Sequence, residues 1–235
     1  MKILFLSKYK PFSEDVAELI KLHFDDAEII FGSINDPFPK HILSKEYDYI
    51  ISYISPWIVP KEVLDNARIA AINFHPGPPE YPGIGCTNFA IYNEEREFGI
   101  AVHHMREKVD SGDIIVVERF PILGQDTVYT LTQRCYAYIY ITFIEIFSLI
   151  LDNKPLPKSK ECWKRKPFTR KELNELRDEI LELTNKQGIM TRPVWKLMHR
   201  LRMYKDCPRM ELHVSENLEK RLISIPSSVV LNGQN

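Results

Sequence analysis

Short apolar runs recur along the first part of the chain, each followed by a turn or a helical pattern. The runs are KILFLSKY, AEIIFGS, YDYIISYIS and IAAINFHP. Nearly continuous apolar runs of this length are typical of strands buried on both faces of a parallel sheet. A helical pattern covers residues 13–24, where Ser13 is the expected cap, and a shorter one covers residues 61–66. We therefore predict an open α/β sheet, mostly parallel and twisted, with flanking helices.

The pattern continues with two more strands and a long helix. A helix is expected over residues 87–93, followed by the strands GIAVHHM and DIIVVERFPI, of which the second alternates partly and so predicts a sheet edge. The long aromatic stretch over residues 127–151 predicts a core helix. Arg134 and Glu145 interrupt this stretch, whereas a membrane span needs about 20 largely uncharged residues.

Two prolines in LDNKPLPKSK end that helix and predict a domain boundary near residue 155. Residues 1–155 are expected to form a Rossmann-like core, and residues 156–235 a C-terminal helical extension. Within the extension, RKELNELRDEILEL is amphipathic, and its charges are most simply a solvated face.

Composition and charge exclude several classes of function. With 235 residues, the chain is long enough for one domain with an appended tail, and its formal net charge of -1 predicts neither a nucleic-acid nor a membrane partner. The N-terminus is apolar only from Ile3 to Leu6, shorter than a signal-peptide core of about 7 to 15 residues, so we expect a cytoplasmic protein. Four cysteines without CxxC pairing indicate structural thiols, and we expect no metal.

The segment INFHPGPPEYPGIG, residues 72–85, is the first candidate for chemistry. Alternate residues of a strand share a face, so Asn73 and His75 project the same way, roughly 6 to 7 Å apart. They lie at the carboxyl end of a strand, where ligands collect in open α/β sheets. The residues that follow predict a stiff loop that brings backbone close to a ligand: Pro76, Gly77, Pro78, Pro79, Pro82, Gly83 and Gly85.

An amide and an imidazole beside a rigid loop suit acyl transfer. The amide can donate to a developing oxyanion, and the imidazole can stabilise that oxyanion or move protons. Asp110, in the turn of KVDSGDII, could orient the imidazole or relay a proton through water. On spacing alone, a local cap with hydrogen-bonded loop residues is the commoner arrangement, and DSG is an ordinary turn signal.

Three linked motifs favour an acyl-transfer site over a local cap, because together they resemble one family. The ordered set PKEVLDNARIAAINFHPGPPEYPGIG, FGIAVHHM and KVDSGDII is similar to the N10-formyltetrahydrofolate-dependent formyltransferases, over approximately residues 1–155. The resemblance implies a catalytic triad of Asn73, His75 and Asp110, with N10-formyltetrahydrofolate as co-substrate. It implies that Asn73 and protonated His75 steady the oxyanion of a tetrahedral intermediate, while Asp110 tunes His75 and helps the amine lose its proton.

The same resemblance places the folate. In this family the pterin lies against backbone of the two loops that match PWIVP and MREKVD. The residues implied are Trp57, Ile58, Val59, Met105 and Val109. Core packing alone would also give apolar side chains at several of these positions.

The surrounding sequence favours one kind of acceptor amine. A glycinamide ribonucleotide is not expected, because the loop SKYKPFS has no glycine to grip a phosphate. An initiator tRNA is not expected, because the basic clusters KRKPFTRK and RPVWKLMHRLR are short and the tail is too short for a linker and a barrel domain. The form HPGPPEYPGIG resembles the branch that formylates amino sugars on nucleotide carriers. That resemblance implies a sugar pocket with Tyr81 and Gly83, and Lys8 and Tyr9 are candidates for the pyrophosphate and base.

The tail carries a second resemblance. Residues 188–228 are similar to the C-terminal end of the pyridoxal-phosphate aminotransferases that make 4-amino sugars on nucleotides. The fragment lacks the lysine-bearing domain for that cofactor, so we expect a packed tail or a dimer contact rather than transamination. The tail nevertheless associates the chain with an amino-sugar pathway.

We therefore predict transfer of a formyl group to a dTDP- or UDP-linked 4-amino-4,6-dideoxyhexose, for O-antigen, lipopolysaccharide or another surface polysaccharide. A homodimer is expected from the apolar surface of the long helix and the tail. Two alternatives stay open: another small amine as acceptor, and a non-catalytic partner of a sugar aminotransferase. Only one of His103 and His104 can face the site, and neither is expected to be catalytic.

Overall fold

The computed structural model describes residues 1–226 of the chain. The chain divides into two compact units, Met1–Phe168 and a second unit that begins at Thr169. The first unit runs past residue 155, near which the prolines predict a domain boundary, and takes in residues 156–168.

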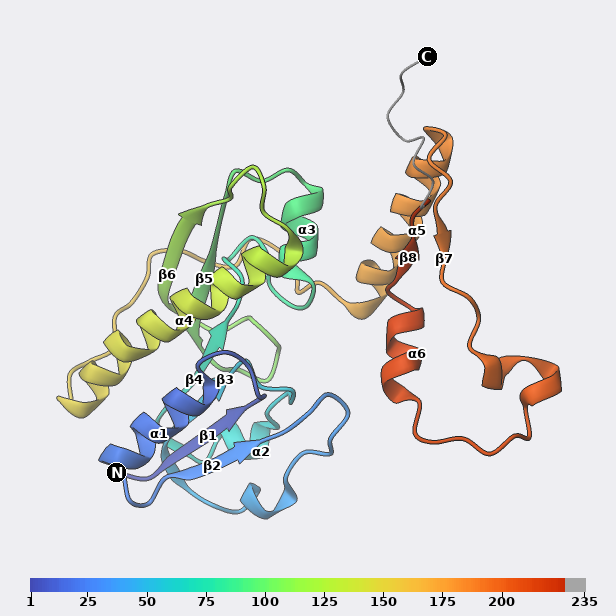
Figure 1. Ribbon diagram of the computed structural model, residues 1–235. Helices are drawn as coiled ribbons and strands as arrows, with labels where there is room; N and C mark the ends of the chain where they lie inside the picture. The colour runs from blue at the N-terminus through green and yellow to red at the C-terminus, as the bar shows by residue number, and fades with distance from the viewer. Residues whose placement is uncertain (227–235) are drawn as a thin grey trace. The chain divides into compact units, whose positions relative to one another are not determined.

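A six-stranded sheet forms the frame of the first unit (Figure 1). Its strands, in the spatial order β2-β1-β3-β4-β5-β6, are β1 (Ile3–Ser7), β2 (Glu28–Phe31), β3 (Tyr47–Tyr53), β4 (Ala67–His75), β5 (Glu97–His104) and β6 (Ile114–Pro121). The helices are α1 (Ser13–His23), η1 (Lys40–Ile42), α2 (Lys61–Leu64), α3 (Cys86–Tyr92) and α4 (Val128–Leu151). Strands β1 to β4 pair in parallel, whereas β4 with β5 and β5 with β6 pair antiparallel. The predicted fold class is confirmed, and β6 is a sheet edge.

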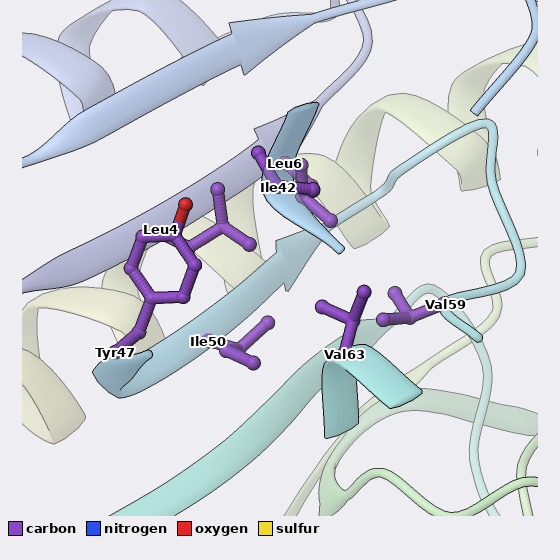
Figure 2. Packing of buried hydrophobic residues seen from close by; sticks show 7 residues of the cluster. All are labelled: Leu4, Leu6, Ile42, Tyr47, Ile50, Val59 and Val63. Atoms are coloured by element: carbon purple, nitrogen blue, oxygen red, sulfur yellow. The ribbon is translucent and has the colours of Figure 1, made fainter. Parts of the chain in front are cut away.

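One face of the sheet carries an aliphatic cluster. Its buried members are Leu4, Leu6, Ile42, Tyr47, Ile50, Val59 and Val63, which point toward one another from β1, η1, β3, α2 and the loop before α2 (Figure 2). Trp57 and Met105 are partly buried and pack against this cluster. The cluster therefore fixes the two loops that follow β3 and β5, on the face that also carries the candidate site.

The long helix α4 covers the opposite face. Its Phe143 packs against Tyr53 and Phe74, with ring centroids 5.9 and 5.5 Å apart. Among residues 1–226, α4 is the one helix with the length and apolar composition of a membrane span. Nine of its side chains are buried, which is the packing expected of a core helix.

The second unit is built around α5 (Arg170–Lys186). Thr169 and Glu172 form a capping box at its start. The other elements are β7 (Arg192–Pro193), η2 (Met198–Arg200), η3 (Arg202–Tyr204), α6 (His213–Glu219) and β8 (Ile223–Ser224), and β7 pairs antiparallel with β8. Among residues 169–226 only Leu176 and Thr191 are buried, so this unit has little core of its own.

Candidate active site

Asn73 and His75 lie at the carboxyl end of β4 and share a face of the sheet. In the register, Asn73 is flanked by Ser52 of the parallel strand β3 and by His103 of the antiparallel strand β5. His75 is buried and Asn73 is half-buried. The strand alternation thus brings an amide and an imidazole to one point of the sheet, as predicted.

The proline-rich loop after β4 folds back over His75. The Tyr81 carbonyl oxygen lies 3.0 Å from Nε2 of His75 and accepts its hydrogen bond. Gly83 has a φ of 91°, and a Cβ at this position would lie 2.4 Å from the Phe168 carbonyl oxygen. Only glycine fits here without strain, because both the backbone conformation and the space exclude a side chain.

Asp110 is the centre of the site. It is 6% exposed and has a φ of 42°, a left-handed conformation that is uncommon for a non-glycine residue and typical of functional positions. Its Oδ2 accepts a hydrogen bond from the Gly83 N–H at 2.7 Å and lies 3.4 Å from Nδ1 of His75. Its Oδ1 lies 3.5 Å from Nδ2 of Asn73. The structure therefore joins all three predicted triad residues in one network.

Asp110 and His75 form a buried ion pair. Burial lowers the pKa of His75, but the Asp110 carboxylate, Cys86 and the Tyr81 carbonyl outweigh it and hold that pKa above its usual range. Burial raises the pKa of Asp110, but the His75 imidazolium and the Gly83 N–H outweigh it and hold that pKa below its usual range. At neutral pH the pair is an imidazolium beside a carboxylate.

His103 also belongs to the network, although we did not expect it to be catalytic. It is 2% exposed, and its Nε2 lies 3.0 Å from Nδ2 of Asn73 and 3.2 Å from Oδ1 of Asp110. His104 is half-buried, so only one of the adjacent histidines faces the site, as the alternation predicts. No sequence signal marks His103, because its register opposite Asn73 is set by the pairing of β4 with β5.

Two further residues were missed. The Trp163 ring packs against the imidazoles of both His75 and His103 in T-shaped contacts, at centroid distances of 5.8 and 5.0 Å. Its Nε1 donates to the Gly112 carbonyl at 2.9 Å. The Cys86 Sγ lies 3.7 Å from Nε2 of His75. Trp163 lies far along the chain in a proline-rich stretch, and no periodic pattern marks it.

The residues implied for folate fall into two groups. Val59 is buried, and Trp57 and Met105 are half-buried against the aliphatic cluster. Ile58 is 70% exposed and Val109 is 39% exposed. All five residues lie on the loops that follow β3 and β5, the two strands that flank β4. Ile58 and Val109 are the exposed members, and they offer apolar surface to a ligand.

The residues implied for the sugar nucleotide are more scattered. Tyr81 is 5% exposed, and its hydroxyl donates to Glu95 at 2.6 Å, so its backbone carbonyl rather than its hydroxyl faces the triad. The Gly83 N–H donates a hydrogen bond to Asp110 and so is already engaged within the site. After β1, Tyr9 stacks on Phe31 at 4.5 Å and is 65% exposed, while burial and Lys10 lower the pKa of the half-buried Lys8. A ligand role for these four residues stays a prediction.

The arrangement suits chemistry that develops negative charge on an oxygen. It offers an amide donor and a cation within one buried network, and the carboxylate keeps that cation protonated. Within residues 1–226, no group of three or more histidines, cysteines, aspartates or glutamates is arranged to hold a metal ion.

Comparison with known families matches the two parts of the chain to two different profiles. Residues 35–145 match the family described as formyl transferase, and residues 132–235 match the DegT/DnrJ/EryC1/StrS aminotransferase family. Both resemblances that the motifs indicate are thereby confirmed. The second match begins within α4, well before the predicted start at residue 188, and its last residues, 227–235, lie outside the described part of the chain.

Among curated proteins, the chain is similar to the methionyl-tRNA formyltransferase of Geobacillus thermodenitrificans, with 29% identity over 136 residues. The matched part is 57% of this chain and 43% of that enzyme. A methionyl-tRNA formyltransferase of Ehrlichia ruminantium is 24% identical over 79% of this chain and 59% of its own length. The chain therefore spans about half the length of the curated relatives it matches.

Solved structures with the same fold include sugar-modifying enzymes. An N-formyltransferase from Helicobacter canadensis, in complex with folinic acid and dTDP-3-aminofucose, superposes with a TM-score of 0.63 and 19% identity, covering 84% of this chain and 90% of that one. The formyltransferase PseJ from Anoxybacillus kamchatkensis gives a TM-score of 0.58 and 22% identity, covering 74% and 89%. At these identities the likeness establishes the fold.

Proposed function

We propose that this chain, whose residues 35–145 match the formyl transferase family, transfers a formyl group from N10-formyltetrahydrofolate to the amine of a nucleotide-linked amino sugar. The observation that carries the proposal is the buried network of Asn73, His75 and Asp110. A purely binding protein has no need to bury an imidazolium, a carboxylate and an amide together, because burying charge is costly.

The acceptor is proposed from the form of the loop and from related structures. The loop HPGPPEYPGIG resembles the sugar-modifying branch, and the Helicobacter canadensis and Anoxybacillus kamchatkensis enzymes are described with a dTDP-linked and a UDP-linked sugar. The aminotransferase match of the tail supports an amino-sugar context. We propose a dTDP- or UDP-linked 4-amino-4,6-dideoxyhexose used for O-antigen, lipopolysaccharide or another surface polysaccharide.

The residues present fit a folate that carries the formyl group to be transferred. The exposed apolar side chains of Ile58 and Val109 and the half-buried Trp57 and Met105 lie on loops that follow the strands on either side of Asn73. Backbone and side chains of these loops would hold the pterin beside the triad.

In the transfer itself, the triad residues have separate tasks. Asn73 donates an amide hydrogen to the formyl oxygen as negative charge grows there, and the His75 imidazolium supplies a second donor. For that, Nε2 of His75 has to exchange the Tyr81 carbonyl for the reacting oxygen. Asp110 keeps His75 protonated and takes up, through water, the proton that the attacking amine loses as its nitrogen bonds to the formyl carbon. When the bond between that carbon and N10 breaks, His75 would supply the proton that N10 needs to leave, and His75 then regains a proton from Asp110.

A mass-spectrometric assay tests the proposal. The purified protein is incubated with N10-formyltetrahydrofolate and a panel of nucleotide-linked amino sugars that vary the base and the amine position, with an amine-free sugar as control. A mass gain of one formyl group on one amino sugar, and none on the control, is the expected result. No transfer to any sugar would overturn the proposed acceptor.

A second candidate acceptor is methionyl initiator tRNA, because the two curated proteins described above as similar in sequence are methionyl-tRNA formyltransferases. The same assay includes that tRNA as a separate arm. Formylation of the tRNA without formylation of any sugar would replace the sugar acceptor and keep the proposed formyl donor.

We also propose that the protein works in the cytoplasm as a homodimer. Apolar side chains on α4 are exposed, among them Tyr129 at 71% and Ile141 at 53%, and a second copy could cover them. Light scattering of the purified protein tests this: the expected mass is twice that of one chain, and the mass of one chain would contradict it.

A further inference from the structure

His103 makes hydrogen-bond contacts at both ring nitrogens. Its Nδ1 lies 2.9 Å from the His104 carbonyl oxygen, and its Nε2 lies 3.0 Å from Nδ2 of Asn73 and 3.2 Å from Oδ1 of Asp110. A carbonyl oxygen can only accept, so Nδ1 carries a proton. The state of Nε2 then decides whether His103 accepts from the amide or donates to the carboxylate.

The charge balance of the site settles that choice. Asp110 is a single carboxylate, and the His75 imidazolium and the Gly83 N–H already face its Oδ2. A second imidazolium at His103, which is 2% exposed and packs against the Trp163 ring in a T-shaped contact, would add an uncompensated buried positive charge. His103 is therefore neutral, with a lone pair on Nε2 that accepts from Asn73.

The amide orientation of Asn73 follows from this. If the amide were turned over, its oxygen would face both the Nε2 lone pair and the Asp110 carboxylate, and both contacts would be repulsive. With the amide nitrogen toward His103, one N–H faces both Nε2 at 3.0 Å and Oδ1 of Asp110 at 3.5 Å, because these two acceptors lie only 3.2 Å apart. Its hydrogen separates the Nε2 lone pair from the carboxylate. The second N–H is thus the one available to a ligand.

We infer that His103 is a positioning residue, which acts through Asn73: the neutral ring holds one amide N–H and thereby aims the other at the reacting oxygen. The inference rests on the proposed function, which gives Asn73 its role in the transfer. It adds a fourth side chain to the predicted triad and assigns the His104 backbone carbonyl the task of fixing the tautomer of His103.

Nitrogen NMR on the full chain tests the hydrogen bonds without any substrate. Long-range proton–nitrogen spectra of histidine-labelled protein, assigned by loss of the His103 signals in His103→Gln, distinguish the three ring states. The expected result near neutral pH is a neutral ring protonated at Nδ1, with a scalar coupling across the hydrogen bond to the Asn73 amide nitrogen. An imidazolium or a ring protonated at Nε2 would overturn the inference, even if the proposed reaction proves correct.

Kinetics with the acceptor found in the formylation assay test the consequence. His103→Leu removes the acceptor and should lower kcat by about tenfold to a hundredfold, with KM for both substrates changed less than about threefold, because the loss falls on the transition state. His103→Gln places an amide oxygen where Nε2 lies and should restore kcat to within about fivefold of the wild type.

The control is His213→Leu, which makes the same replacement at an exposed histidine outside the site and should leave kcat unchanged. Thermal unfolding of each variant separates loss of fold from loss of positioning. Wild-type kcat in His103→Leu, or equal losses in the leucine and glutamine variants at equal stability, would overturn the inference. If the wild type formylates no acceptor, the proposed function fails, and the NMR result still decides the role of His103.

Discussion

At the scale of single residues, the site depends on donors that meet the growing negative charge in the transition state. Asn73→Ala and His75→Asn should each lower turnover by about a hundredfold or more, because a preorganised donor to an oxyanion contributes that much. Folate affinity, measured by calorimetry with folinic acid, should stay nearly unchanged, since both residues act on the reacting oxygen. Near-normal turnover in both variants would remove the proposed site.

The buried ion pair makes stability depend on pH. The raised pKa of His75 stabilises the fold fully below the ordinary histidine value of 6.5, and this contribution is lost as pH rises through the folded-state pKa. The lowered pKa of Asp110 stabilises the fold above the ordinary aspartate value of 3.8, and this contribution is lost as pH falls through the folded-state pKa. The pair therefore contributes most between these two ordinary values.

Asp110→Asn should lower the free energy of unfolding by about 3 kcal/mol near pH 6, and the loss should shrink toward about pH 9. Urea unfolding at the two pH values measures it. Asp113→Asn is the control, because Asp113 is an exposed aspartate whose ion pair, within the described part of the chain, is with the exposed Arg106, and it should show no such difference. A loss for Asp110→Asn that does not change with pH would contradict the ion pair.

The residue scale also shows what the sequence can and cannot predict. Asn73, His75 and Asp110 could be predicted, because strand alternation and three linked motifs point to them. His103 could not, since alternation says only that one of two adjacent histidines faces the site. The charge balance around Asp110, which decides the role of His103, depends on distances between segments that are far apart in the sequence.

At the scale of elements, the proline-rich loop holds the site through its contact with residue 168. The N–H of Phe168 donates to the Pro82 carbonyl, and the N–H of Ile84 donates to the Phe168 carbonyl. Gly83 lies between these two hydrogen bonds and donates to Asp110. A side chain at this position would therefore disturb both the loop and the carboxylate.

Gly83→Ala should destabilise the protein by about 1 to 3 kcal/mol and lower turnover, because it combines a positive φ with a clash. Gly124→Ala is a matched control, since a Cβ there meets nothing within 4 Å. Chemical unfolding and the formylation assay measure the two effects. Equal stability in the two alanine variants would contradict this prediction, because the loop would then accommodate a Cβ at residue 83 without loss of stability.

Elements were easier to predict from the sequence than their ends. The six strands follow from apolar runs, and the long helix α4 follows from the aromatic stretch over residues 127–151. The start of α1 differs from the prediction: Phe12, with a φ of 66°, is the cap, and Ser13 is the buried first residue of the helix. The Ser13 hydroxyl accepts from the Lys10 N–H at 3.3 Å instead, a local turn contact that periodicity does not reveal.

At the scale of the whole molecule, the segment that follows α4 completes the first unit. Ser159 donates its N–H to the Ile114 carbonyl, Lys164 donates to the Pro79 carbonyl, and Arg119 pairs with Glu161 at 2.6 Å. Prolines predict an end to the helix but not where the following chain returns. For that reason the sequence could not show that this segment places Trp163 against the two site histidines.

Two shortened chains, ending at Phe168 and at Lys158, separate the roles of this segment and of the second unit. The chain ending at Phe168 keeps every contact described for the site and should bind folinic acid and transfer formyl groups nearly as the full chain does. The chain ending at Lys158 loses Trp163 and the backbone hydrogen bonds to Pro79 and Pro82, so its melting temperature and its turnover should both fall. Calorimetric unfolding and the formylation assay measure them. If the longer fragment is folded but inactive, the second unit takes part in the reaction, and the site described above is incomplete.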